Sequence, residues 1–176
     1  GATLTGAKLS KADLTGANLT SAILTNADLT GVKLNNADLD LANLSGTNLT
    51  GANFTGATVQ STVFSTTTNG VVTAANLTKA TLTGVNLTGI NLTDVDLSGA
   101  DLTNANLSNV ILTGANLTNT IMTGAILTGA VGATPGPSTI GFNNSNEANT
   151  SSNENQSTTS SYIAKADAAS SQNLNP

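Results

Sequence analysis

Apolar and polar residues recur in a period of five from the first residue to about residue 130. Each pentad reads alanine, Asp or Asn, leucine, Thr or Ser, and a turn former, as in Ala12-Asp13-Leu14-Thr15-Gly16. The central slot recurs 13 times from Leu4 through Phe64 and 12 times from Val72 through Leu127, and Leu fills 20 of these 25 slots. The slot two residues earlier is mostly Ala. Each pentad therefore offers one large and one small side chain to an interior.

Neither a helix nor a long strand can hold this pattern. Helical steps of about 100° would place successive leucines about 140° apart, and an odd spacing would put them on alternate faces of a strand. Within a pentad the two apolar slots lie two residues apart, which is strand spacing. The last slot is Gly in 12 pentads and Asn in five, and both residues accept positive φ angles. The pattern predicts short strands with one corner per pentad, stacked into a solenoid that rises about 4.8 Å per coil.

The tandem A(D/N)LxX pattern resembles the pentapeptide-repeat family over roughly three quarters of the chain. This resemblance implies an all-β fold, a right-handed quadrilateral parallel β-helix with four pentads per coil and about six coils over residues 1–132. Residues 20 apart would then stack. Lys8 would lie beside Asp28, and Asp13 beside Lys33, as two pairs of opposite charge.

The chain contains few residues that could perform chemistry. It has no Cys, His or Trp, which removes thiol and imidazole ligands and any imidazole base. Ser and Thr fill the slot after the leucine, with no base near them by pattern. The second-slot aspartates share their position with Asn, so a backbone or solvent role explains them: Asp13, Asp28, Asp38, Asp96 and Asp101. We therefore expect no catalytic residue, no cofactor and no metal site.

Charge limits the class of partner. Members of the family that bind DNA gyrase imitate duplex DNA, which would need roughly 17 negative charges over a rod of this length. The repeat region has seven Asp and four Lys, a net charge of −3, so the match is poor. Five lysines without arginine give no basic footprint for nucleic acid. No apolar run is long enough to span a membrane.

The period is interrupted once, at residues 65–71. Phe64 and Val72 stand eight residues apart instead of five, and the extra residues include Asn69-Gly70. This segment predicts a small bulged corner with three additional residues. If the pentad around Val72 takes the next side, the sides before and after the break stay in register.

Apolar residues replace Asn or Asp at the outward second slot near the end of the repeat, and these are Ile111, Ile121 and Ile126. Several such residues at one end of a solenoid suggest that something covers it. Residues 133–176 form a Ser-, Asn- and Thr-rich tail with four apolar anchors, Ile140, Phe142, Tyr162 and Ile163, and residues 161–169 are predicted as a short helix. We interpret the three isoleucines of the repeat, together with Phe142, Tyr162 and Ile163, as contacts of an intramolecular cap; the alternative is a homodimer through this end.

The leading functional hypothesis is a non-enzymatic, rod-like interaction or scaffold protein with a protein partner. The alternative is a DNA mimic that binds a type II topoisomerase, and a third hypothesis is ice binding, because 17 of the 25 fourth slots are Thr. Repeated sequons such as Asn18-Leu19-Thr20 disfavour a glycosylating secretory pathway. Bacterial cytoplasm, periplasm or the lumen of a bacterially derived organelle are the expected locations, and an export signal removed before Gly1 is left open.

Overall fold

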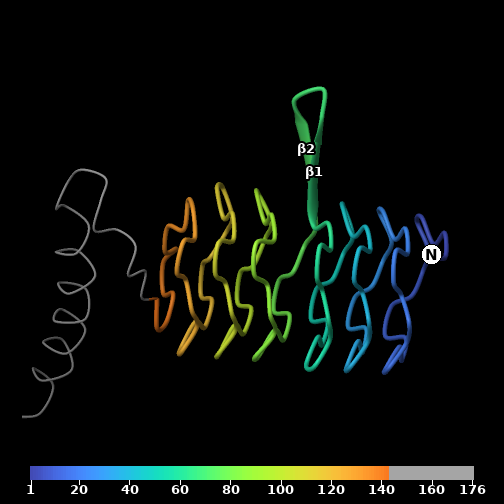
Figure 1. The fold of residues 1–176 in the computed structure, drawn as a ribbon, viewed down its shortest axis with the longest axis horizontal. Coiled ribbons are helices and arrows are strands. Elements are labelled where there is room, and N and C mark those ends of the chain that lie inside the picture. The colour runs from blue at the N-terminus through green and yellow to red at the C-terminus, as the bar shows by residue number, and fades with distance from the viewer. Residues whose placement is uncertain (143–176) are drawn as a thin grey trace, which may run out of the picture. The chain divides into compact units, whose positions relative to one another are not determined.

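The computed structural model describes residues 1–142, which form a β-solenoid (Figure 1). Single-residue parallel bridges join backbone positions 20 residues apart, for example Lys8 to Asp28 and Asp28 to Asn48. Each pentad contributes one corner, so 20 residues make a coil with four sides. The predicted stacking of residues 20 apart is therefore confirmed.

We name the four sides A to D by the outward second-slot residues that stack along each of them. Side A holds Thr3, Ile23, Asn43, Val63, Asn91, Ile111 and Val131; side B holds Lys8, Asp28, Asn48, Asn76, Asp96 and Asn116; side C holds Asp13, Lys33, Asn53, Thr81, Asp101, Ile121 and Ile140; side D holds Asn18, Asp38, Thr58, Asn86, Asn106 and Ile126.

The polar slots of the pentad build the corners. The side-chain Oδ1 of the second-slot residue accepts a hydrogen bond from the backbone N–H two residues later, as Asn53 does from Thr55 at 2.9 Å. This local ring turns the chain away from the strand direction. The corner residue that follows has positive φ, which is 58° at Asn26 and 66° at Gly16. The sequence requirement for Gly or Asn at this slot thus has a backbone cause.

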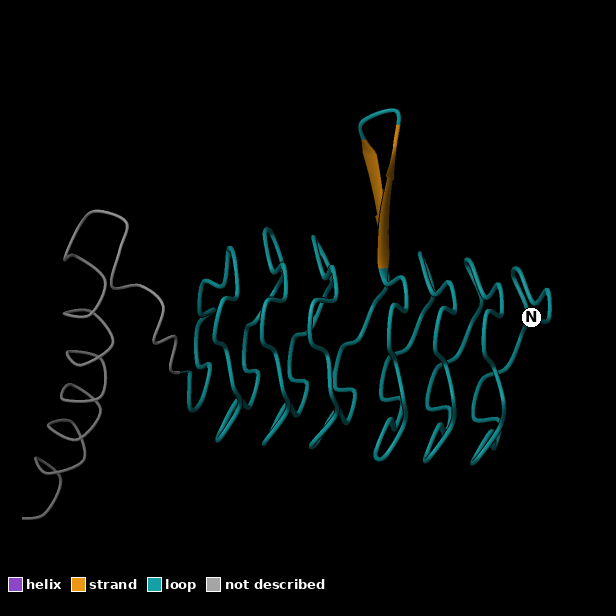
Figure 2. Ribbon diagram, in the orientation of Figure 1, coloured by secondary structure: helices purple, strands orange, loops and turns teal. Residues whose placement is uncertain are grey.

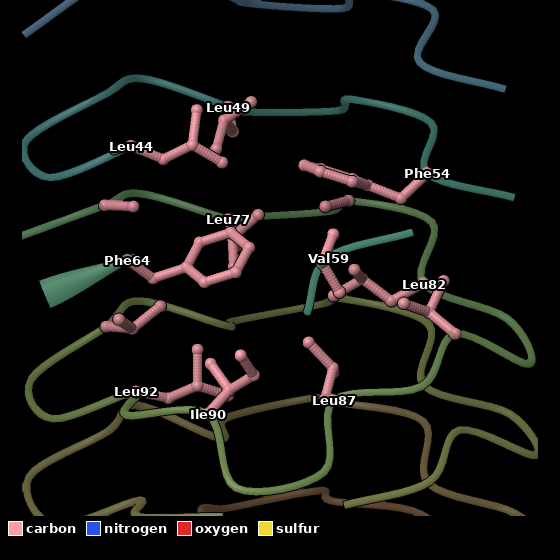
Figure 3. Close-up of a cluster of buried hydrophobic side chains, with 14 of the residues drawn as sticks. Leu44, Leu49, Phe54, Val59, Phe64, Leu77, Leu82, Leu87, Ile90 and Leu92 are labelled. Atoms are coloured by element: carbon pink, nitrogen blue, oxygen red, sulfur yellow. The ribbon is translucent and has the colours of Figure 1, made fainter. Parts of the chain in front are cut away.

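The central and small slots fill the interior. Figure 3 shows that leucines and phenylalanines of successive coils point inward and stack on one another. Leu24 and Leu77 are fully buried, and so are Phe54 and Phe64. The two phenylalanine rings pack at a tilt, with centroids 6.4 Å apart and an interplanar angle of 56°. This pair fills the core directly beneath the interruption of the repeat.

The interruption is a β-hairpin and not a bulged corner. Strand β1 (Ser65–Thr68) pairs antiparallel with β2 (Val71–Ala74), and the hairpin projects from the wall of the solenoid (Figures 1 and 2). Asn69 and Gly70 both have positive φ, 51° and 77°, as a two-residue type I′ turn requires. The β-branched residues on either side of the Asn-Gly pair favour strands.

The hairpin adds eight residues to one corner, and the stack continues past it on sides B and C. Bridges that cross it join residues 28 apart, such as Asn48 to Asn76. Ala75 N donates to Phe64 O at 2.8 Å, so the turn bond of an ordinary corner is kept. Leu77 takes the next side of the coil, whereas Val72 lies half-buried in β2. The predicted three-residue insertion, with Val72 as a core centre, was therefore wrong.

Residues 131–142 lie against the last coil, although residues from 133 onward were predicted to form a tail. Val131 bridges to Ile111 and Ile140 bridges to Ile121, while Ala133 is buried. The predicted helix over residues 161–169 lies outside the described residues. Within residues 1–142, no helix has the length and apolarity to cross a bilayer.

Candidate interaction surface

The aspartates singled out by the sequence serve the backbone. Each accepts a hydrogen bond from the N–H two residues later, and the distances range from 2.9 to 3.1 Å: Asp13, Asp28, Asp38, Asp96 and Asp101. The Ser10 hydroxyl and the Thr30 hydroxyl and N–H also donate to Asp28 and lower the pKa of its carboxyl to about 2. The predicted backbone role is confirmed. Among residues 1–142, no three His, Cys, Asp or Glu residues cluster as metal ligands.

Opposite charges pair on sides B and C. Backbone β-bridges place Lys8 beside Asp28 and Asp13 beside Lys33. The side chains of the second pair form an ion pair, with Lys33 Nζ 3.2 Å from Asp13 Oδ2. Both predicted neighbour pairs are confirmed. Both partners of the ion pair are more than half exposed, so water screens the attraction and its contribution to stability is small.

Charge is distributed unevenly around the described solenoid. We call sides B and C with the corner between them the B–C half, and sides D and A with the corners that follow each of them the D–A half. The B–C half holds Lys8, Lys11, Lys33 and Lys79 with Asp13, Asp28, Asp96 and Asp101; the D–A half holds Asp38, Asp40 and Asp94. The B–C half is thus neutral. The whole net charge of −3 in residues 1–142 lies on the D–A half, which has no lysine.

Away from the C-terminal end of the repeat, three exposed apolar residues lie on the D–A half or on the hairpin that leaves it. Ile23 is 44% exposed, Leu41 60% and Val71 65%. Leu41 occupies a corner slot with φ of 61°, a conformation that costs a leucine about 1–2 kcal/mol. Leu41 was not among the residues predicted from the sequence. Its signal was a large apolar residue at a slot that otherwise favours Gly and Asn.

The predicted end residues are exposed but differ in their neighbours. Ile111 and Ile121 have stacked partners in Val131 and Ile140, whereas the single bridge of Ile126 joins it to Asn106 of the preceding coil. Phe142 packs partly buried against the core. Tyr162 and Ile163 lie outside the described residues. A cap or a dimer contact at this end stays a prediction.

The ladder of bridges is interrupted on the D–A half beside the hairpin. Thr58 and Asn86 are successive on side D, as Val63 and Asn91 are on side A, yet neither pair is bridged. Sides B and C stay bridged at the same level through Asn76 and Thr81. At this level the two successive coils therefore remain joined along sides B and C and are unpaired along sides D and A.

We call the resulting opening the notch. It encloses about 220 Å³ at the corner between sides D and A, and it is lined by Gln60, Ser61, Asn86 and Thr88. Two coils at this corner are linked by Leu41 N, which donates to Gln60 O at 2.9 Å, and by Gln60 N, which donates to Asp40 Oδ1 at 2.7 Å. Asp40 and Leu41 thus support one lip of the notch.

A family model for pentapeptide repeats matches eight copies of the repeat, over residues 1–36, 30–65, 73–109 and 90–129. The chain belongs to the pentapeptide-repeat family. Its proteins of known structure are right-handed quadrilateral β-helices. The matches leave out residues 66–72, which make up most of the hairpin, so the hairpin is an addition to the repeat itself.

Several solved structures of this family resemble the chain. HetL, involved in heterocyst differentiation regulation in the cyanobacterium Nostoc, is 26% identical, with 78% of this chain and 71% of HetL covered and a TM-score of 0.34. Rfr23 from the cyanobacterium Cyanothece is 32% identical, with 70% of this chain and 63% of Rfr23 covered and a TM-score of 0.24. A protein of the Arabidopsis thaliana thylakoid lumen is 30% identical (59% and 63% covered, TM-score 0.35). No curated protein matches the chain.

Proposed function

We propose that this chain is a non-enzymatic interaction scaffold that binds a protein partner through the D–A half and its hairpin. The observation that carries the proposal is the hairpin of residues 65–74, which projects from an otherwise regular wall. Its outward strand edges and the exposed Val71 offer backbone groups and an apolar side chain to a partner. Pentapeptide repeat proteins are generally structural or interaction proteins.

The scaffold we propose is a right-handed rod of about six coils, with handedness taken from the family. A stack of coils of this kind holds distant surface positions at fixed separations. Many hydroxyl groups and the amide oxygens of the pentads are engaged in corner hydrogen bonds; for example, Ser45 Oγ donates to Asn43 Oδ1 at 2.7 Å. Recognition therefore falls to positions that depart from the repeat.

Topoisomerase binding by charge mimicry has weaker support. The three uncompensated aspartates fall far short of one charge per about 1.7 Å of rod. Ice binding also has little support, because fourth-slot threonines end every side: Thr25 on side A, Thr30 on side B, Thr55 on side C and Thr20 on side D.

The proposal is tested with a variant in which residues 65–74 are replaced by Thr-Gly, which restores an ordinary corner between Phe64 and Ala75. Both forms are used as bait in extracts of the native organism, and retained proteins are identified by mass spectrometry. We expect at least one protein that the full chain retains and the variant does not. Identical retention by both forms would contradict a recognition role for the hairpin, and turnover of a substrate by the purified chain would contradict the scaffold.

A further inference from the structure

The notch exposes backbone groups that the repeat pairs elsewhere. One coil earlier, Leu39, Leu41 and Leu44 N–H donate to carbonyls of the next coil at 2.7–2.9 Å. The equivalent donors at the notch are Val59, Ser61 and Phe64 on one lip and Asn86 and Asn91 on the other. Within residues 1–142, none of these five N–H groups donates a hydrogen bond. The notch thus presents two short, facing strand edges, which are templates for another strand.

The size and lining of the notch favour a polypeptide over a small molecule. Its volume of about 220 Å³ is below the ~300–1,000 Å³ of typical small-molecule pockets. Its walls are the polar residues Gln60, Ser61, Asn86 and Thr88, with no apolar floor, because Val59 and Leu87 point into the core and are 1% exposed. Free main-chain donors and acceptors at a strand edge are recognised by an extended chain, which supplies both.

The surroundings of the notch define the chemistry of that chain. Asp40 supports one lip through Gln60, Asp38 lies on side D, and Asp94 stands at the corner after side A. The N–H of Asp40 and the side-chain hydroxyls of Thr20 and Thr58 donate to Asp38 and lower the pKa of its carboxyl. The D–A half has no lysine within residues 1–142. A partner segment with basic residues is complementary to this charge.

Leu41 adds an apolar contact beside the same lip. Its side chain is 60% exposed, its φ is 61°, and its N–H donates a hydrogen bond to Gln60 O. A leucine that is both exposed and in a costly backbone conformation gains most when a partner covers it. The side chain lies at the corner between sides D and A, where an apolar residue of a bound segment would reach it.

We propose that the notch and the acidic surface around it bind an extended, basic segment of a partner polypeptide, with apolar residues among the basic ones. Its backbone pairs with the open edges at Val59–Phe64 and Asn86–Asn91, and its basic side chains lie near Asp38, Asp40 and Asp94. The proposal rests on the proposed scaffold function and names the chemistry of the partner. A second copy of this chain fits less well, because its β1 and β2 have no basic residue.

The first test measures amide hydrogen exchange by NMR on the full chain. In the free protein we expect the amides of Val59, Ser61, Phe64, Asn86 and Asn91 to exchange about tenfold faster than paired amides, because each lacks one hydrogen bond. The paired reference amides are Leu49, Phe54 and Thr81 on sides B and C. A peptide of about eight residues that alternates lysine and valine, with blocked ends, is then added.

The peptide should slow the exchange of these notch amides about tenfold and leave the reference amides unchanged. A peptide of the same sequence with alternate backbone nitrogens methylated should lose this effect, since it cannot pair as a strand. A glutamate–valine peptide should bind at least about tenfold more weakly. Equal binding of all three peptides, or no change at the notch amides, would overturn the proposal. Protection that rises with protein concentration alone would assign the notch to self-association and would also overturn it.

Matched variants separate this inference from the scaffold function. Asp40→Asn keeps an oxygen acceptor for Gln60 N, and Leu41→Asn places a residue that this corner slot accepts at Asn109; circular dichroism confirms that each is folded. We expect each to weaken lysine–valine peptide binding at least about fivefold, while Asp101→Asn on side C has no effect. If a natural partner is retained by both notch variants but lost when the hairpin is removed, the notch proposal fails and the scaffold function stands.

Discussion

The B–C half and the D–A half of the solenoid are built from the same pentads but differ in continuity. On sides B and C the bridges continue past the hairpin through Asn76 and Thr81, and charges of opposite sign balance. On sides D and A the bridges stop at the notch, the charge is −3, and Ile23 and Leu41 are exposed. One half of the solenoid therefore provides continuous support, and the other half carries the departures from the repeat on which a partner can act.

The largest expected effect is on the free energy of unfolding, when either of two buried leucines at the level of the notch is replaced. Leu82 on side C and Leu87 on side D are 0% and 1% exposed. Thr81 N, beside Leu82, donates to Ala52 O at 2.8 Å, whereas the corresponding Asn86 N has no such bond. Leu→Ala at either site should cost about 2–5 kcal/mol. We expect the smaller loss at Leu87, because the unpaired side can close over the cavity.

Urea unfolding monitored by circular dichroism measures both losses. The pair Leu102→Ala and Leu107→Ala, one coil further on, serves as a control, because sides C and D are both bridged there to the coils before and after. That pair should show nearly equal losses. A larger loss at Leu87 than at Leu82 would contradict the view that the notch side is the more adaptable one.

The next effect is a gain of stability at Leu41. Leu41→Gly removes the steric cost of a side chain at the positive φ of 61° and should stabilise the protein by about 1 kcal/mol. Lys79→Gly is the matched change on the B–C half, where φ is 57°. Thermal unfolding should show similar gains for both. Binding of the lysine–valine peptide should weaken for Leu41→Gly alone; unchanged binding would separate the strained leucine from recognition.

The pH dependence of stability tests which interactions stabilise the B–C half. The folded pKa of Asp28 is about 2, below the ordinary value of 3.8, so its contribution to stability is present above about pH 4 and is lost as the pH falls towards 2. The Ser10 hydroxyl is the largest cause of this lowered pKa and the Lys8 charge the smallest. Ser10→Ala should therefore raise the pKa of Asp28 more than Lys8→Gln does.

NMR titration of the Asp28 carboxyl measures both shifts. The unfolding temperature followed from pH 5 to pH 2 should show a smaller acid-dependent loss in Ser10→Ala than in the unchanged chain. A larger pKa change in Lys8→Gln would mean that charge, and not hydrogen bonding, sets the ionisation of Asp28.

The smallest effect is expected at the exposed ion pair. Lys33→Gln removes the partner of Asp13 at 3.2 Å and should change the unfolding temperature very little, because both side chains are solvated. The pKa of Asp13 should still rise slightly, since the Lys33 hydrogen bond lowers it less than the Thr15 hydrogen bonds do. A large loss of stability relative to Lys79→Gln, measured in the same low-salt buffer, would show that this pair has a structural role.

The sequence was sufficient for the features that repeat in every coil. The five-residue period predicted the buried leucines and the corner residues with positive φ, and the resemblance to the family added the stacking of residues 20 apart, which makes Lys33 and Asp13 neighbours. These features depend on contacts within one pentad or between adjacent coils, so a local pattern contains them.

The departures were harder to predict. Val72 resembles a pentad centre, and taking it as one hid the hairpin, although Asn69-Gly70 between β-branched residues is a strong hairpin signal. The one sequence signal at the notch was the pentad Ala57-Thr58-Val59-Gln60-Ser61, which departs from the pattern at its second, third and fourth slots, whereas Asn86 belongs to an ordinary pentad. Whether they pair depends on how the coils meet after the hairpin. The exposure of Ile111, Ile121 and Ile126 could be predicted from their outward slot. The residues that contact them could not.

The corner at Phe64 and Ala75 has a consequence for protein engineering. Its closing hydrogen bond of 2.8 Å is intact although ten residues stand between the two, and the coils on sides B and C resume in register. The free energy needed to close a loop rises only slowly with its length. Any peptide whose ends meet as β1 and β2 do could be grafted here, which makes this corner a natural display position on a rigid carrier.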